Sequence, residues 1–137
     1  MSTQPRGIRN HNPGNLEWGQ KWQGLVANPT DRRFCQFCHP LWGIRALARV
    51  LVTYYRRYKI NSVATIIRRW APPNENNTQA YIDSVCSHSG LAANTPLRVD
   101  TEAILSRLVP AIIAHENGEQ PYRPELIREA ILKALEK

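Results

Sequence analysis

The apolar positions of this chain recur at helical spacing in five segments, separated by prolines, glycines and polar turns. The longest segment begins at Pro40 and runs to about Tyr58, with a proline suited to the first helical turn. The others span residues 62–70, 79–89, 101–117 and 124–135. The pattern predicts a mainly α-helical, compact fold.

The residues before Pro40 lack this helical periodicity. Residues 6–15 are rich in Gly, Pro and Asn, which predicts a turn-rich loop. The stretch from Trp18 to Cys38 contains two tryptophans, two glycines and a polar turn at residues 28–31. We expect it to form a small irregular β-hairpin. Pro110 inside the fourth helix predicts a kink there.

The length of 137 residues is typical of a single domain, so residues 1–137 are expected to fold as one unit. We expect no transmembrane segment, because no apolar run approaches membrane-spanning length. The first ten residues are polar and basic, which leads us to expect no secretory signal peptide.

A net charge of +7 indicates an anionic partner, for which nucleic acid, an anionic membrane surface and the bacterial cell-wall polymer all qualify. Two arginine pairs with nearby tyrosines favour the alternative of a nucleic-acid-binding or virion structural protein without catalysis. An ordinary solvated helix face explains such arginines equally well. The pairs are Arg56-Arg57 and Arg68-Arg69, with Tyr54, Tyr55 and Tyr58.

Cys35, Cys38 and His39 form the C-x-x-C-H spacing used for covalent haem attachment. That use needs export, and a zinc site with the distant Cys86 lacks a second clustered pair of ligands. We therefore expect no metal and no cofactor, with the cysteines packed as small hydrophobic residues.

The helix over residues 101–117 ends in His115-Glu116-Asn117 before Gly118, a natural left-handed cap. Glu116 follows Ile112 and Ile113 by four and three residues, so it shares their face and points toward the core or a cleft. Partial burial and the negative end of the helix dipole both favour a proton on this side chain, which is what a general acid needs. An exposed position in a fraying last turn is the plainer reading of the same residues.

Most of the 11 acidic residues of the chain need no chemical role. Several lie at helix starts or on the solvent face of the last helix, where a negative charge is favourable or solvated. We rank Glu116 first as the catalytic acid, with Glu75 and Glu17 behind it as loop carboxylates that could line a cleft.

Several motifs taken together resemble a family of short phage and prophage proteins that act on the cell wall. The opening R-G-I-R-N-x-N-P-G-N at residues 6–15 carries the resemblance, with matches around residues 21–24, 33–34, 40–47, 69–73, 75–82 and 115–118. A deeper similarity is to the lysozyme-like superfamily, through residues 15–47 and 77–85. Asn77 replaces the glutamate of lytic transglycosylases in the second of these segments.

The resemblance implies a lysozyme-like fold and cleavage of the β-1,4 bond that joins N-acetylmuramic acid to N-acetylglucosamine in peptidoglycan. Those enzymes carry the catalytic helix before the asparagine segment, whereas the only helix ending in Glu and Gly here lies near the C-terminus. A circular permutation would explain that order. Muramidase and lytic transglycosylase both remain open.

Under this hypothesis, we expect Asn12, Asn15, Trp70 and Tyr81 to contact sugar through amides and aromatic faces. The partner would be peptidoglycan glycan strands, nucleic acid would not be obligatory, and the protein would act as a monomer. It would be made in the host cytoplasm and reach the wall after release or as part of a phage particle.

Overall fold

A computed structural model describes residues 4–73 and 77–136, which form six helices. Their bounds are α1 (Arg6–Arg9), α2 (Pro40–Tyr58), α3 (Val63–Trp70), α4 (Thr78–Ser89), α5 (Glu102–Asn117) and α6 (Pro124–Leu135). The mainly α-helical, compact fold expected from the sequence is confirmed. The five longer helices match the five periodic segments.

Local side-chain chemistry fixes where these helices begin. Ser62 and Thr65 form a reciprocal capping box at the start of α3. Thr101 caps α5, its hydroxyl accepting from the Ile104 amide. At α4 the cap is Asn77, whose side chain accepts from the Ala80 amide, so the helix begins one residue before the predicted range of 79–89. The Thr78 hydroxyl donates to the Ala71 carbonyl at 2.7 Å.

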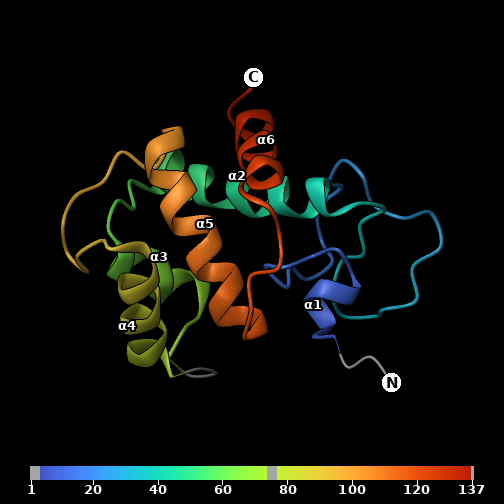
Figure 1. Cartoon of the computed structure of the whole chain (residues 1–137), viewed down its shortest axis with the longest axis horizontal. Helices are drawn as coiled ribbons and strands as arrows, with labels where there is room; N and C mark the ends of the chain where they lie inside the picture. Colours follow the sequence, from blue (N-terminus) through green and yellow to red (C-terminus); the bar gives the residue numbers. More distant parts are fainter. Residues whose placement is uncertain (1–3, 74–76, 137) are drawn as a thin grey trace.

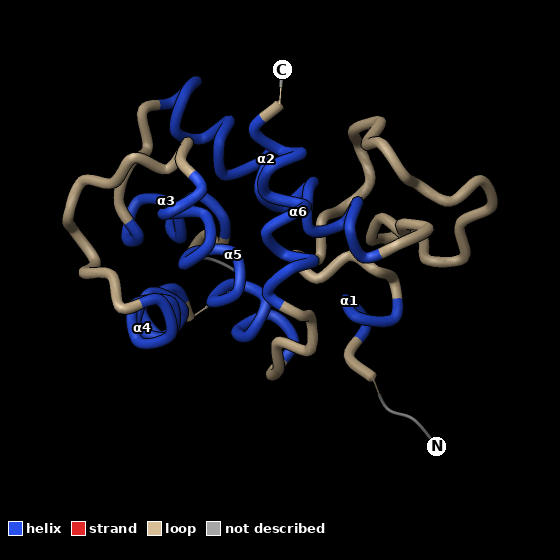
Figure 2. Tube along the Cα trace, turned by 45° about the horizontal axis from the view of Figure 1, so that its top comes forward, coloured by secondary structure: helices blue, strands red, loops and turns tan. Residues whose placement is uncertain are grey.

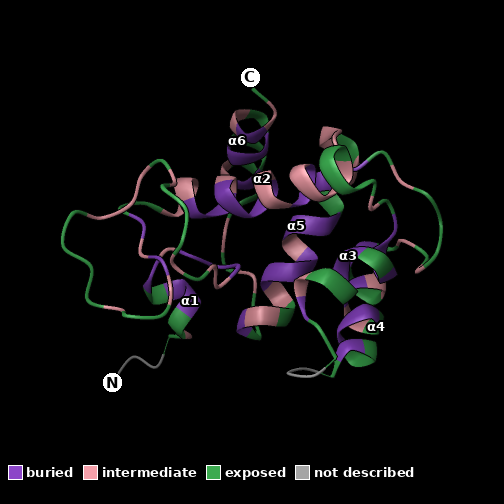
Figure 3. Cartoon of the chain, turned by 180° about the vertical axis from the view of Figure 1, so that it is seen from behind, coloured by how far each residue is buried: buried purple, intermediate pink, exposed green. Residues whose placement is uncertain are grey.

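The helices bury one large apolar core. In Figure 1, α2 crosses the molecule, α6 packs across it, and α5 runs diagonally past both, with α3 and α4 to one side. Figure 3 shows the buried faces turned inward. Residues with no exposed surface from four of the helices form the centre of this core, namely Leu47, Leu51, Ile66, Leu105, Ile112 and Ile131.

The segment before α2 is irregular (Figure 2). Its Cys35 and Phe37 pack with Ala46 of α2 in a second, smaller cluster. Where the sequence predicted a small β-hairpin, the described chain has two isolated antiparallel bridges, Glu17 with Phe34 and Leu25 with Phe37. The turn-rich stretch at residues 6–15 contains the one-turn helix α1, which was not expected.

Helix α5 continues through Pro110 as one element and ends at Asn117. Gly118 caps it in the expected left-handed conformation, with φ 74°. None of the helices in the part of the chain that the structure describes has the length and apolar content needed to cross a membrane.

Candidate active site

Glu116 lies in the last turn of α5, where the helix end meets the N-terminal loop. It is half-buried, on the same side of the helix as the buried Ile112 and Ile113. The sequence prediction that its side chain points toward the core or a cleft is therefore confirmed.

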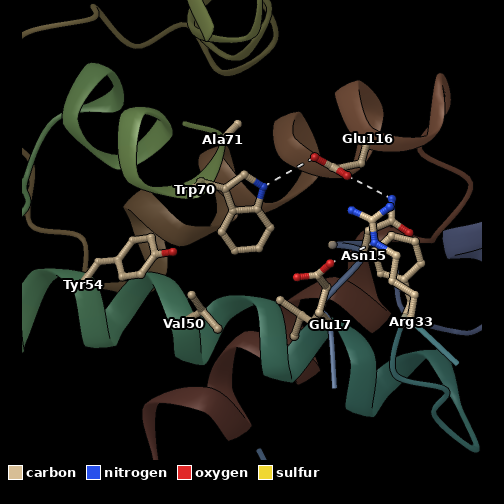
Figure 4. Close-up of a pocket in the computed structure, with 11 residues that line it drawn as sticks. Asn15, Glu17, Arg33, Val50, Tyr54, Trp70, Ala71 and Glu116 are labelled. Carbon is tan, nitrogen blue, oxygen red and sulfur yellow. Dashed lines mark hydrogen bonds and ion pairs between the residues drawn. The ribbon is translucent and has the colours of Figure 1, made fainter. Parts of the chain in front are cut away.

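Three side chains from separate segments donate hydrogen bonds to the Glu116 carboxylate. Asn15 Nδ2 donates to Oε1 at 2.9 Å, and the Tyr81 hydroxyl donates to Oε2 at 2.7 Å. Trp70 Nε1 also faces Oε2, at 3.4 Å, which is long for this bond type. Figure 4 shows the Trp70 and Asn15 contacts on either side of the carboxylate. The three donors fix the orientation of Glu116.

The loop places Asn15 by an unusual backbone conformation. Its φ is +52°, in the left-handed region that Asn tolerates better than most residues. The backbone N–H of Asn15 donates to the backbone carbonyl of Asn12 at 2.9 Å, which closes a tight turn. The turn directs the Asn15 side chain toward the end of α5.

Two hollows meet at Glu116. The larger, about 400 Å³, is lined by residues that include Asn15, Glu17, Arg33, Tyr54, Trp70 and Glu116 (Figure 4). The second, about 270 Å³, lies between α4 and the end of α5, with Asn77, Tyr81 and His115 in its wall. Glu116 therefore contributes to the wall of both hollows.

A buried asparagine joins the end of α5 to the loop. Asn117 Nδ2 donates to the Pro13 carbonyl at 2.9 Å and to the Ile113 carbonyl at 3.0 Å. The loop approaches so closely that a Cβ on Gly7 would lie 2.5 Å from Asn117 Oδ1 and 2.8 Å from Asn15 Oδ1. This packing holds Asn15 and Glu116 together.

Tyr81 is nearly fully buried and stacks on His115, with ring centroids 3.8 Å apart. Burial, together with the neighbouring Glu116, raises the pKa of the Tyr81 phenol well above its usual value. The phenol therefore stays protonated and remains a hydrogen-bond donor. Burial lowers the pKa of His115, which favours a neutral ring.

The structure brings three of the four predicted sugar-contacting residues, Asn15, Trp70 and Tyr81, onto Glu116. The prediction that Asn12 contacts sugar is wrong, because Asn12 is fully buried within the loop. Its amide nitrogen donates to the Leu16 and Cys35 carbonyls, and its oxygen accepts from the Leu16 amide. All its polar groups serve the loop, so it does not reach the hollow.

Of the two lower-ranked acids, Glu17 lines the same hollow as Glu116. It is exposed and pairs with Arg33 at 2.8 Å. Glu75 lies outside the described residues. The described part of the site thus contains one oriented carboxylate and a second, solvent-facing one.

Asp31 organises the loop in a way that sequence reasoning missed. Its carboxylate accepts from Arg6 through two bonds of 2.7 and 2.8 Å, from Asn10 Nδ2, and from the Arg33 and Phe34 amides. These hydrogen bonds, of which the one from Arg6 has the largest effect, hold the pKa of Asp31 far below its usual range. The polar turn around Asp31 was the only sequence signal for this role.

The cysteines differ in environment. Cys35 is fully buried in the small cluster, as expected for a hydrophobic packing role, whereas Cys38 is exposed. His39 caps α2, with its Nδ1 accepting from the Leu41 amide at 3.0 Å. This ring nitrogen therefore already has a structural partner.

The fold and the arrangement around Glu116 define a small helical protein with one carboxylate held at a surface hollow. The chain is 38% identical over 128 residues to Protein P5 of Pseudoalteromonas phage PM2, an alignment that covers 90% of this chain and 78% of the relative. The chain belongs to the family of this phage protein. No protein-family model matches the sequence.

Proposed function

We propose that this protein cleaves the glycan strands of peptidoglycan, with Glu116 as the general acid. The observation that carries the proposal is the convergence of Asn15, Trp70 and Tyr81 on Glu116 at the junction of two surface hollows. The three donors hold the carboxyl group in one orientation beside a polar hollow, and a fixed position toward the substrate is the first requirement for proton transfer by a general acid. The sequence similarity to a phage protein is consistent with a role in lysis or wall penetration.

In the proposed reaction, Glu116 donates its proton to the glycosidic oxygen as the bond from that oxygen to C1 of the muramic acid breaks. Oε1 accepts only the Asn15 hydrogen bond among the described residues, which leaves it a lone pair for the transferred proton. In a lytic transglycosylase, the resulting carboxylate then takes the proton of the sugar's 6-hydroxyl as that oxygen bonds to C1.

A hydrolytic muramidase would instead use water, and a second group would hold it. Glu17 is our candidate for that role, because it is a described carboxylate that lines the same hollow. Its ion pair with Arg33 would have to open or shift toward the water. The transglycosylase route needs Glu116 alone.

The lysozyme-like relationship and the circular permutation belong to the same proposal. Their support is that Asn15 and Glu116 touch although 101 residues separate them. In such a permutation, α5 would precede the loop that contains Asn15. The two ends of the described chain lie apart in Figures 1 and 2, so neighbouring termini do not add to this support.

The deciding experiment digests purified sacculi with the wild type, Glu116→Gln and Glu17→Gln, and analyses the soluble products by mass spectrometry. Anhydro ends indicate a transglycosylase, and reducing ends indicate a hydrolase. We expect Glu116→Gln to release almost nothing and Glu17→Gln to retain more activity. The proposal fails if the wild type releases no fragments or if Glu116→Gln releases them at the wild-type rate.

The alternative, a non-catalytic nucleic-acid or virion protein, draws on one observation. The Arg69 guanidinium lies over the rings of Tyr54 and Tyr58, at 5.3 and 4.0 Å from their centroids. This is a basic aromatic surface of the kind that binds single-stranded nucleic acid. Retention of labelled single-stranded DNA that is lost in Arg69→Gln, without release of wall fragments by the wild type, would favour it.

A further inference from the structure

A third hollow, with a different character, lies between α2, α6 and the loop before α2. It has a volume of about 250 Å³, and its wall contains Arg45, Arg49 and Lys133, with Trp42, Gln23 and Glu136. Three positive side chains and one negative one therefore face the same space. We call it the α2–α6 pocket.

The pocket lies away from Glu116. Successive residues of an α-helix are turned by about 100°, so Arg45 and Arg49 lie on the side of α2 opposite to Val50 and Tyr54. Val50 and Tyr54 line the hollow beside Glu116. The two hollows thus use opposite sides of one helix, and their functions can be tested separately.

The positive side chains of the pocket are not all explained by the fold. Arg49 Nη1 donates to the Ala134 carbonyl at 3.0 Å, near the C-terminal end of α6, where a cation is favourable. Arg45 and Lys133 form no ion pair with an acidic side chain in the described part of the chain. Glu136 is the single carboxylate that partly offsets them.

The two arginines also repel each other. They are four residues apart on α2, and like charges at this spacing destabilise a helix. Burial, followed by the charge of Arg49, lowers the pKa of the Arg45 guanidinium. A bound anion would relieve both effects.

We propose that the α2–α6 pocket binds a phosphate group carried on an organic molecule. The guanidinium group of arginine can donate two parallel hydrogen bonds to phosphate oxygens. The three cations and one carboxylate of the pocket carry a net charge of about +2, which matches a phosphate group with up to two negative charges. Lys133 Nζ lies 5.8 Å from the centroid of the Trp42 ring, so an aromatic surface borders the charged part. The Trp42 ring and the Gln23 amide would contact the organic part.

The test compares a double variant, Arg45→Gln with Lys133→Gln, against a control that loses the same charge elsewhere, Arg57→Gln with Arg68→Gln. Arg49 is kept because it caps α6. The soluble probe is pyrophosphate, measured by titration calorimetry against chloride at equal ionic strength. The membrane probe is phosphatidylglycerol vesicles, measured by co-sedimentation against phosphatidylcholine vesicles.

We expect the pocket variant to lose affinity for at least one probe by about tenfold or more, and the control to stay near wild type. Binding of pyrophosphate but not of vesicles indicates a soluble phosphate compound, and pocket-dependent binding to anionic vesicles indicates a lipid headgroup. If the double variant does not fold, the single variants Arg45→Lys and Arg45→Gln replace it in the test. Arg45→Lys should then retain more affinity than Arg45→Gln. Equal losses in both double variants, or wild-type protein that binds neither probe, would overturn the proposal.

Discussion

Asn15 and Glu116 are joined by a hydrogen bond of 2.9 Å from the Asn15 amide to Oε1 of the carboxylate, across 101 residues of chain. Asn117 makes a parallel connection from the next position of α5, to the Pro13 carbonyl. The loop and the helix end therefore form one unit. The geometry of the candidate site depends on how closely these two segments pack.

Gly7 is the position most sensitive to that packing. A Cβ there would lie 2.5 Å from Asn117 Oδ1, 2.8 Å from Asn15 Oδ1 and 2.9 Å from the Asn12 carbonyl oxygen. We expect Gly7→Ala to lower the free energy of unfolding by about 1–3 kcal/mol, the usual cost of overpacking. Chemical denaturation measures this, and an unchanged free energy of unfolding in Gly7→Ala would show that the loop and the end of α5 can separate without cost.

Asp31 gives the stability of the loop a defined pH dependence. Its pKa is lower in the folded chain than the ordinary value of 3.8, so its contribution is fully present above that pH. The contribution is lost as the pH falls below about 3.8 toward the folded pKa. Asp31→Asn should therefore melt below wild type at pH 7.

The difference between Asp31→Asn and wild type should shrink on acidification from pH 5 to pH 2, measured as Tm by circular dichroism. Asp83→Asn is the control, since Asp83 is exposed and accepts from only Gln79 among the described residues. A difference that stays constant over this range would show that the Asp31 charge does not stabilise the loop.

The two cysteines of the C-x-x-C-H stretch should respond differently to substitution. Cys35 is fully buried beside Phe37 and Ala46, with its Sγ donating to the Glu17 carbonyl at 3.5 Å. Cys35→Ser replaces the sulfur by a smaller, more polar group in this cluster and should cost about 1–2 kcal/mol even if the hydroxyl keeps that acceptor. Cys38 is exposed, and Cys38→Ser should change stability by less than about 0.5 kcal/mol. Thermal melting of the two single variants compares them directly, and a larger loss from Cys38→Ser would point to a role for that thiol beyond packing.

The helices were largely predictable from sequence, and the reason is visible at their ends. α2 and α6 begin at Pro40 and Pro124, as expected, because proline suits a first helical turn. α1 was missed because four residues are too few to show periodicity. It is held by the tertiary contact of Arg6 with Asp31, which no local pattern reveals.

The site was predictable in part. Glu116 could be singled out because a helix spacing and a glycine cap fixed its face, and the family resemblance pointed to Asn15, Trp70 and Tyr81. Asn12 belongs to the same asparagine-rich turn as Asn15, yet one amide is buried and the other faces the hollow. That difference depends on the packing of residues 12–16 against Cys35, which sequence spacing does not encode.

Tyr81→Phe tests whether the hydrogen bond to Glu116 matters for activity. The change removes the 2.7 Å contact while the ring can still stack on His115. We expect activity on sacculi to fall by about tenfold, since one net hydrogen bond is worth about 1 kcal/mol and more when an ion accepts it. Because the pKa of Tyr81 is raised above its ordinary value of 10.0, the phenol itself stays protonated between about pH 6 and about pH 9. Wild-type activity in Tyr81→Phe would contradict a donor role.

Glu116→Gln separates catalysis from structure. Glutamine keeps the size of the side chain and one oxygen acceptor for Tyr81 and Trp70, but it cannot deliver a proton. The new amide hydrogens would face Asn15, whose own Oδ1 is buried without a hydrogen-bond partner in the described structure. A rotation of the Asn15 amide would turn that oxygen toward the new side-chain nitrogen and would put Nδ2 where Oδ1 now lies, so the number of buried polar groups without a partner stays the same.

Stability of Glu116→Gln should therefore equal or slightly exceed wild type, while activity falls by about 10²–10⁴-fold, the usual contribution of general acid catalysis. Melting curves and turbidity loss of purified sacculi measure the two effects on the same preparation. Glu17→Gln is the matched control, because Glu17 is exposed in the same hollow and pairs with Arg33. If Glu116→Gln clears sacculi at the wild-type rate with an unchanged Tm, Glu116 is not the acid, and the lysozyme-like mechanism for this chain is wrong.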